Sequence, residues 1–195
     1  MSLSLLDELI LEFQSAKDAS EPNAFLGSLA TCDSSGQARV RTVVIHELTA
    51  KGLLLVASEF HQKWRQLSAN PKAEIMLWWP SLGLQYRITG KCISQSPDVA
   101  SARWSQLPPS VRRLDLAYGD GFIPGQAIES IEKVSETVAE RSEGKSIETT
   151  PSHVRAILFE PEEIERLKTS PSDRQHDRRR ATLIDGQWHC QQLVP

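Results

Sequence analysis

The stretch Arg41-Thr-Val-Val-Ile-His46 places a cationic side chain on a segment whose β-branched residues favour an extended strand. A second apolar segment, Gly52-Leu-Leu-Leu-Val-Ala-Ser58, follows it, and Lys63 comes shortly afterwards. An arginine in an apolar strand needs a partner for its charge. A phosphate is one suitable partner, because two N–H groups of a guanidinium can bind two phosphate oxygens at once. The ordinary alternative is a surface ion pair with a carboxylate, and composition alone favours that alternative.

Residue patterns around this stretch predict a mainly β chain decorated with helices. Apolar residues at helical spacing predict an N-terminal helix over about 4–17, and a short helix is expected at 60–69, before Asn70-Pro71. The segment at 52–57 is almost wholly apolar, which indicates a strand buried on both faces. Alternation of residues and turn signals predict strands at 25–31, 39–46, 52–57, 73–79 and 84–94.

The second half of the chain begins with a helical insertion over about 96–144, which Ser96-Pro97 opens as a helix start. Residues 154–160 predict a strand, and residues 161–168 fit either a short helix or a continuation of that strand. Asp185-Gly186 predicts the turn of a C-terminal hairpin over about 179–193. We therefore expect residues 1–195 to form a single domain, a closed or split β-barrel with added helices.

Composition excludes several classes of protein. The formal net charge of −3 argues against a general nucleic-acid binder. The three cysteines lie far apart without metal-ligand spacing, which fits a reducing compartment. The N-terminus has no basic region and is not expected to be a signal peptide, and no apolar run approaches the roughly 20 residues that span a bilayer. We expect a cytoplasmic protein that binds neither nucleic acid nor membrane and holds no metal.

The order of these segments resembles the pyridoxamine 5′-phosphate oxidase family. The resemblance is carried by Arg41–His46, Gly52–Ser58 and Lys63, continued by Gln85-Tyr-Arg-Ile-Thr-Gly90 and closed by Arg174-Gln-His-Asp-Arg178. Members of that family are split β-barrels that bind flavin mononucleotide (FMN) and build two flavin sites across a dimer interface. The resemblance thus implies an FMN-binding split β-barrel, a homodimer with FMN at the subunit interface, and a small-molecule substrate.

Most of the candidate residues are implied as contacts of the cofactor. Arg41 and Lys63 match residues that contact FMN in the family, Lys63 at the phosphate, and Gln62 stands where the family has a second phosphate-binding cation. Gln85 matches a glutamine at the edge of the flavin ring, and an amide suits that mixed edge because it both donates and accepts. The implied cofactor residues are Arg41, Thr42, Val43, Val44, His46, Val56, Ala57, Gln62, Lys63, Gln85 and Arg178.

A smaller set of residues is implied at the substrate. Arg174 and His176 match the family's substrate-contacting arginine and histidine, and are the candidate catalytic residues. His46, Trp104 and Arg112 are the candidate substrate-binding residues. An ordinary solvated loop is the alternative reading of the charged segment that contains Arg174 and His176.

Several residues depart from the family pattern, at both the cofactor and the substrate. His46 replaces a lysine, Val56-Ala57 replace a more polar Tyr-Thr pair, Pro108 stands where an arginine is expected, and Lys168 replaces a tryptophan. These differences imply a retained flavin site beside an altered substrate pocket.

The resemblance implies an FMN-dependent oxidase acting on a CH–NH2 donor such as pyridoxamine 5′-phosphate. Two alternatives remain open at this point. One is a flavin reductase or another FMN-linked electron-transfer protein, and the other is a non-catalytic FMN-binding protein. The sequence contains neither a glycine-rich dinucleotide fingerprint nor a phosphate-binding Gly-Lys-Ser/Thr loop.

Overall fold

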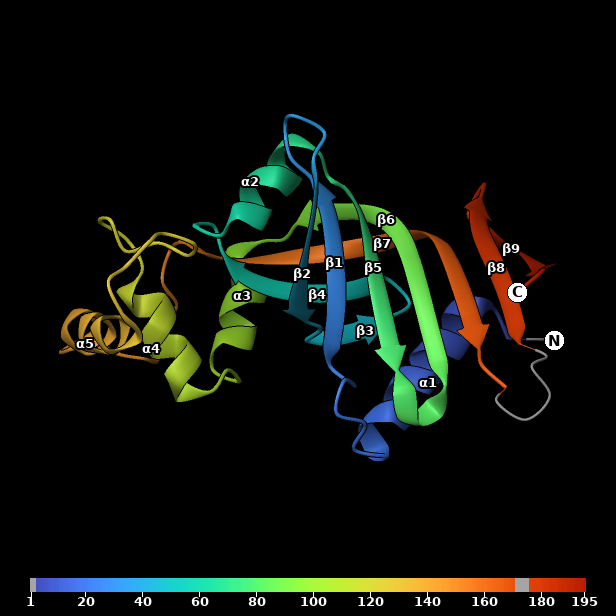
Figure 1. Cartoon of the computed structure of the whole chain (residues 1–195), viewed down its shortest axis with the longest axis horizontal. Coiled ribbons are helices and arrows are strands. Elements are labelled where there is room, and N and C mark those ends of the chain that lie inside the picture. The colour runs from blue at the N-terminus through green and yellow to red at the C-terminus, as the bar shows by residue number, and fades with distance from the viewer. Residues whose placement is uncertain (1–2, 171–175) are drawn as a thin grey trace.

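A computed structural model describes residues 3–170 and 176–195 of the chain (Figure 1). Its helices are α1 (Leu5–Asp18), α2 (Gln62–Ala69), the 3-10 turn η1 (Pro80–Leu82), α3 (Pro97–Trp104), α4 (Pro109–Ala117) and α5 (Ile131–Ser142). Its strands are β1 (Leu26–Cys32), β2 (Ala38–Val44), β3 (Glu47–Thr49), β4 (Gly52–Ser58), β5 (Lys72–Trp79), β6 (Leu84–Ser94), β7 (Val154–Lys168), β8 (Asp177–Ile184) and β9 (Gln187–Leu193). Most of the sequence-based elements are confirmed to within a few residues.

The strands form one curled, antiparallel half-barrel sheet, as the sequence predicted for a split barrel. Its order is β2-β1-β5-β6-β7-β4-β3, and the β8–β9 hairpin joins it through β7. Strand β7 is 15 residues long and pairs with β6 along most of its length. Its first part also pairs with β4 and its last part with β8, so residues 161–168 continue the strand instead of forming a helix. One long strand therefore connects two distant parts of the fold.

The predicted strand at 39–46 is two residues too long, and the reason lies in how the chain closes the barrel. Strand β2 ends at Val44. The next backbone N–H, of Ile45, donates to the Phe25 carbonyl at 2.7 Å, and that of His46 donates to the Leu54 carbonyl at 2.9 Å. The chain thus leaves the β1 side of the sheet and reaches β4 within two residues, which places His46 between the two parts of the sheet. The three-residue strand β3, which follows, was not predicted.

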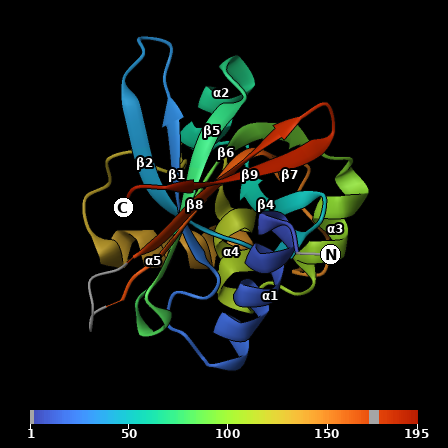
Figure 2. The ribbon, with the colours of Figure 1, turned by 90° about the vertical axis from the view of Figure 1, so that its right-hand side faces the viewer.

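Helix α1 covers one face of the sheet and completes the main core. Ser4 caps the helix, and its side chain and that of Asp7 form a reciprocal capping box. Leu5, Leu9 and Phe13 pack in the same cluster as the buried residues of β5 and β6. Figure 2 looks onto the end of the molecule where α1 and the β8–β9 hairpin lie together. This end carries the predicted hairpin, whose turn residues Asp185 and Gly186 both have positive φ angles, as a type I′ turn requires.

Helices α3, α4 and α5 lie at the opposite end of the molecule (Figure 1). A second apolar cluster joins α3 to the strands there, and it consists of Leu54, Ala100, Trp104, Val154 and Ala156. Because this cluster fixes α3 against β4 and β7, the following helix α4 stands over the end of β4. Among the described residues, no helix combines the length and hydrophobicity needed to cross a membrane.

Candidate functional site

The principal cavity lies between the ends of β2 and β4 on one side and helix α4 on the other. Its volume is about 700 Å³, which falls in the range of small-molecule and cofactor sites. The β side contains seven residues that the sequence marked as cofactor contacts. They are Thr42, Val43, Val44, His46, Val56, Ala57 and Lys63. The structure therefore brings together much of the predicted cofactor set, although its members come from three separate segments.

Arg41 lies beside this cavity and its side chain turns toward β1 and α2. Its guanidinium donates to the Leu29 carbonyl at 3.2 Å, to Thr31 Oγ1 at 2.6 Å and to Gln66 Oε1 at 2.7 Å. All three acceptors are neutral, so the positive charge has no carboxylate partner among the described residues. The surface ion pair that composition favoured is therefore absent there. Burial lowers the Arg41 pKa.

Lys63 stands at the start of α2 and points into the cavity wall. Burial, and to a smaller extent the charge of Arg41, lower its pKa to about 8, and Asp115 partly opposes both effects. The ammonium group forms no hydrogen bond or ion pair with any described residue. No side chain caps the N-terminus of α2, and its first turn holds no acidic residue. Gln62, the other half of the predicted phosphate pair, is exposed and does not line the cavity.

The opposite wall comes from α4, on which the sequence predicted Arg112 as a substrate residue but not the residues that face the cavity. Pro108, Val111, Asp115 and Tyr118 all line the cavity. They are three or four residues apart, so they form one face of a helical turn. That spacing was visible in the sequence, but nothing in it indicated what the face would meet. Burial raises the pKa of Asp115 to about 6 and that of Tyr118 to about 12, with the charge of Asp115 adding to the second shift.

The two residues of this region that were predicted to bind substrate do not line the cavity. Trp104 is fully buried in the second apolar cluster, and its Nε1 donates to the Ile147 carbonyl at 2.7 Å. Arg112 donates to the same carbonyl at 3.1 Å and to Glu148 at 3.1 Å. Both side chains hold residues 147–148 in place, because they point from α3 and α4 toward that segment and away from the cavity.

A second group of predicted residues lies on β6, on β8 and immediately before β8. Gln85 pairs with Leu167, and Leu167 pairs with Arg178, so Gln85 and Arg178 share one row across three strands and one face of the sheet. Arg178 contacts Glu165 at 2.9 Å, and His176 Nδ1 accepts a bond from the Ser170 N–H at 3.0 Å. Arg174 lies outside the described residues. None of Gln85, His176 and Arg178 lines the cavity.

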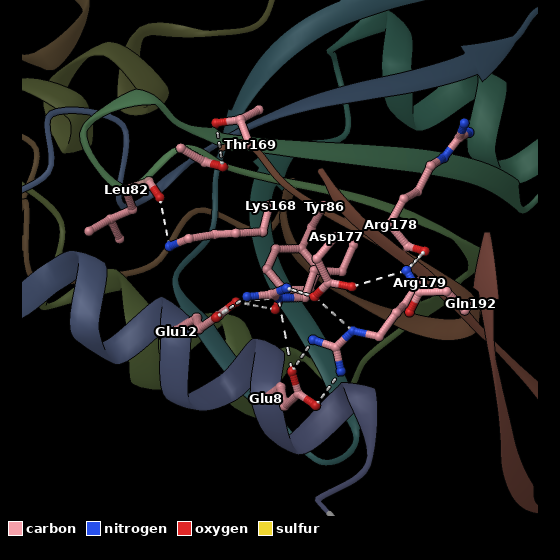
Figure 3. A network of polar contacts seen from close by, with 12 residues as sticks. Glu8, Glu12, Leu82, Tyr86, Lys168, Thr169, Asp177, Arg178, Arg179 and Gln192 are labelled. Carbon is pink, nitrogen blue, oxygen red and sulfur yellow. Dashed lines mark hydrogen bonds and ion pairs between the residues drawn. The ribbon is translucent and has the colours of Figure 1, made fainter. Parts of the chain in front are cut away.

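The orientation of this second group depends on an ion-pair network beneath β8, drawn in Figure 3. Arg166 bridges Glu12 of α1, at 2.7 Å, and Asp177, at 2.9 Å. Arg179 bridges Glu8 and the same carboxylate of Asp177, at 2.8 Å and 3.1 Å. Because successive strand residues point to opposite faces, Arg178 points away from α1, as Figure 3 shows.

Sequence comparison places the chain among known proteins. A profile described as pyridoxamine 5′-phosphate oxidase matches residues 16–114. A pyridoxine/pyridoxamine 5′-phosphate oxidase of Synechocystis is 30% identical over 180 residues, which cover 92% of this chain and 82% of that protein. A pyridoxine/pyridoxamine 5′-phosphate oxidase of Paraburkholderia phytofirmans is also 30% identical, and the match covers 94% of this chain and 85% of that protein.

This chain belongs to the pyridoxamine 5′-phosphate oxidase family. Solved structures agree on the fold. PhzG from Burkholderia lata, solved with tetrahydrophenazine-1-carboxylic acid, superposes with a TM-score of 0.87 at 21% identity, covering 98% of this chain and 93% of that one. A pyridoxamine 5′-phosphate oxidase-related, FMN-binding protein from Nostoc punctiforme gives 0.80 at 19% identity, with full coverage of both chains.

Family membership explains why the predicted cofactor residues gather where they do. The names of the relatives suggest a flavin cofactor, and the cavity wall formed by β2, β4 and α2 carries the motif order on which the family resemblance was based. The second group of predicted residues is at the other end of the molecule, since α4 and β8 lie at opposite ends in Figure 1. Within one chain, the two groups of this family member do not converge.

Proposed function

We propose that this chain binds FMN in the cavity between β2, β4 and α4 and acts as an FMN-dependent oxidoreductase with an altered substrate pocket. The observation that carries the proposal is the pair of cations Arg41 and Lys63. The two charges are close enough for Arg41 to lower the pKa of Lys63, and neither forms an ion pair with a described carboxylate. Two neighbouring, half-buried cations that form no ion pair with a described carboxylate, with Asp115 acting on Lys63 only from beyond ion-pair distance, favour a dianionic ligand such as a phosphate.

The local backbone and side chains also fit a phosphate. The uncapped start of α2 has backbone N–H groups available for an anion, and the helix dipole favours negative charge there. Gln66 is 5% exposed, and its Nε2 has no hydrogen-bond partner among the described residues, although its Oε1 accepts from both Thr31 and Arg41. Three kinds of donor, namely cations, backbone N–H groups and a side-chain amide, thus lie on or beside α2.

Bound FMN would supply a ring system that accepts a hydride from a donor carbon. The residues of the chain would bind and orient it. Lys63 and Arg41 would attract the phosphate, while the backbone of Thr42–Val44 would lie along the ring, as the family resemblance implies. Leu55, Val56 and Val111 would keep water out of the space beside the ring, since they line it with apolar groups.

A second copy of the chain would complete the site. None of Gln85, His176 and Arg178 lines the cavity of its own chain, and β8, which carries Arg178, lies at the opposite end of the molecule from α4, so we propose that these residues reach the cavity of a partner in a homodimer. Apolar side chains on the β1–β2 side of the sheet support this assembly. Val40 is 68% exposed and Val44 is 48% exposed, and Val44 also lines the cavity, so the apolar surface runs into the proposed flavin site.

The test begins with purified protein mixed with excess FMN, followed by dialysis and absorbance spectroscopy. Retained flavin bands support the proposed cofactor, and a colourless, flavin-free protein overturns it. Loaded protein is then mixed anaerobically with an amine donor, starting with pyridoxamine 5′-phosphate, or with a nicotinamide donor, and bleaching of the flavin is followed. Bleaching by an amine supports the oxidase. Bleaching by the nicotinamide donor alone indicates a reductase, and no bleaching with any donor indicates a binding protein.

A further inference from the structure

The charges around the cavity are unevenly distributed, and this distribution bears on the substrate. Among the described residues that line it, Lys63 is the only lysine or arginine and Asp115 is the only carboxylate. His46 and His61 also line it, but burial lowers the pKa of both, in His61 to about 4, so both are neutral near pH 7. If the FMN phosphate occupies the Lys63 end and a partner's Arg178 also serves FMN, the lining residues of this chain leave no lysine or arginine for a second phosphate.

The α4 wall offers apolar surface where a phosphate would need donors. Leu107, Pro108, Val111 and Leu114 line the cavity there. Arg112, the nearest cation on this helix, is directed to the other side, where it contacts Ile147 and Glu148. A phosphate placed against this wall would lose its hydration without gaining a charged partner, and that is costly.

One polar end of the α4 wall is suited to a cation. The Asp115 carboxylate is half-buried and lines the cavity, and it accepts no hydrogen bond and forms no ion pair with the described residues, although the charge of Lys63 acts on it from a greater distance. The rings of His61 and Tyr118 meet edge to face beside it, with centroids 5.7 Å apart. The Nδ1 of His61 contacts the Ser58 carbonyl at 3.1 Å, which requires the proton on Nδ1 and leaves Nε2 as an acceptor. Aromatic rings and free acceptors together favour an ammonium group.

We propose that the substrate of this cavity is an apolar, ring-sized amine without a phosphate group, and that Asp115 binds its ammonium group. This inference rests on the proposed FMN-dependent function, because it assigns Lys63 to the cofactor. It differs from the substrate in the names of the curated relatives by the loss of the phosphate. Asp115 then selects the substrate by charge, and the apolar face of α4 selects it by shape.

The experiment uses full-length, FMN-loaded protein at pH 7.5 and measures dissociation constants from changes in the flavin spectrum. Pyridoxamine is compared with pyridoxamine 5′-phosphate, which differs only by the phosphate, and benzylamine is compared with benzyl alcohol, which lacks the ammonium group. We expect pyridoxamine to bind at least tenfold more tightly than its phosphate ester, and benzylamine at least tenfold more tightly than benzyl alcohol.

Two variants locate the ammonium site. Asp115→Asn should weaken benzylamine tenfold or more and remove its advantage over benzyl alcohol in protein saturated with FMN, since a bond to a charged group is lost only for the amine. Asp120→Asn, the same change at an exposed position outside the cavity, should leave all constants unchanged. Melting temperatures of both variants show whether each is folded.

The outcomes separate the two proposals. Tighter binding of the phosphate ester by FMN-loaded protein overturns the phosphate-free substrate and leaves the proposed function standing. Unchanged benzylamine binding in a folded Asp115→Asn variant overturns the role of Asp115 in the same way. Failure to bind FMN at all overturns the proposed function and, with it, the inference that depends on it.

Discussion

The proposed flavin site makes FMN affinity depend on the protonation of Lys63. Its pKa in the free protein is lowered to about 8 by burial and by Arg41, so the side chain is mostly charged at pH 7 and mostly neutral at pH 9. Only the charged form attracts a phosphate, whose own second pKa near 6 keeps it dianionic throughout this range. Binding a dianion raises the pKa of the bound lysine. FMN affinity should therefore fall as pH rises through about 8.

The size of this effect follows from the two protonation equilibria. For a free-state pKa of about 8 and a much higher value in the complex, the dissociation constant scales as 1 + 10^(pH − 8), so it rises about tenfold between pH 7 and pH 9. Removing the charge by Lys63→Met deletes a bond to a charged group worth roughly 1.5–3 kcal/mol. That corresponds to a roughly 10- to 150-fold weaker complex at pH 7.

Fluorescence titration of FMN at pH 7, 8 and 9 measures both effects. Wild type should show the tenfold loss of affinity, and Lys63→Met should bind weakly with little dependence on pH. Lys63→Arg is the matched control, because a guanidinium stays charged across this range and should give tight binding at all three values. Wild-type affinity that does not change between pH 7 and pH 9, or Lys63→Met binding as tight as wild type, would refute the role assigned to Lys63.

Three further changes test the architecture. Arg166→Met leaves the Glu12 carboxylate without its 2.7 Å partner and should lower the free energy of unfolding in urea by about 3 kcal/mol; a loss below about 1 kcal/mol would contradict a structural role for this pair. Gly52→Ala should lower the free energy of unfolding by at least about 2 kcal/mol in the same assay, because φ is +131° there and the added Cβ would overlap a backbone oxygen of β7. An unchanged urea midpoint would rule out this contact. Val40→Asp should dissociate the proposed dimer in sedimentation experiments, whereas Ile131→Asp, equally exposed on α5 at 70%, should not; equal behaviour of the two variants would argue against the β2 interface.

Local signals predicted the parts of the fold that depend on local chemistry. The Asp185-Gly186 turn and the capped start of α1 were predictable because turn and cap residues act on their own backbone. Residues 161–168 were ambiguous because helix or strand there is decided by pairing with β6 and β8, which are distant in sequence. The short strand β3 was missed for a different reason, because its pairing with the adjacent β4 involves only three residues of each strand and so leaves a weak local pattern.

The site was predictable to different degrees on its two sides. Thr42–Val44 and Lys63 were found because consecutive segments carry them in a recognisable order. Asp115 was missed because its helical spacing defines a face without defining the neighbour of that face. Trp104 was expected at the substrate, but α3 turns it into the apolar cluster with Leu54 and Val154, and no local signal sets that rotation. Whether the predicted residues contact FMN remains a prediction.

Strand β7 explains how one chain can carry two parts of a site that never meet within it. The strand has 15 residues and therefore a contour length of roughly 50 Å. Near its start it pairs with β4, which lines the cavity, and near its end it pairs with β8. Asp177 is held from below by Arg166 and Arg179, so Arg178 faces outward. There, among the residues that the structure describes, its partners are Glu165 and the Val194 carbonyl. In a two-fold dimer the same contact is made twice, so one interface would bring each Arg178 to the cavity of the other chain. The separation of the two groups within the monomer is thus a reason to expect two sites per dimer and none in an isolated chain, and loss of flavin on dilution below the dimer dissociation constant would be its direct consequence.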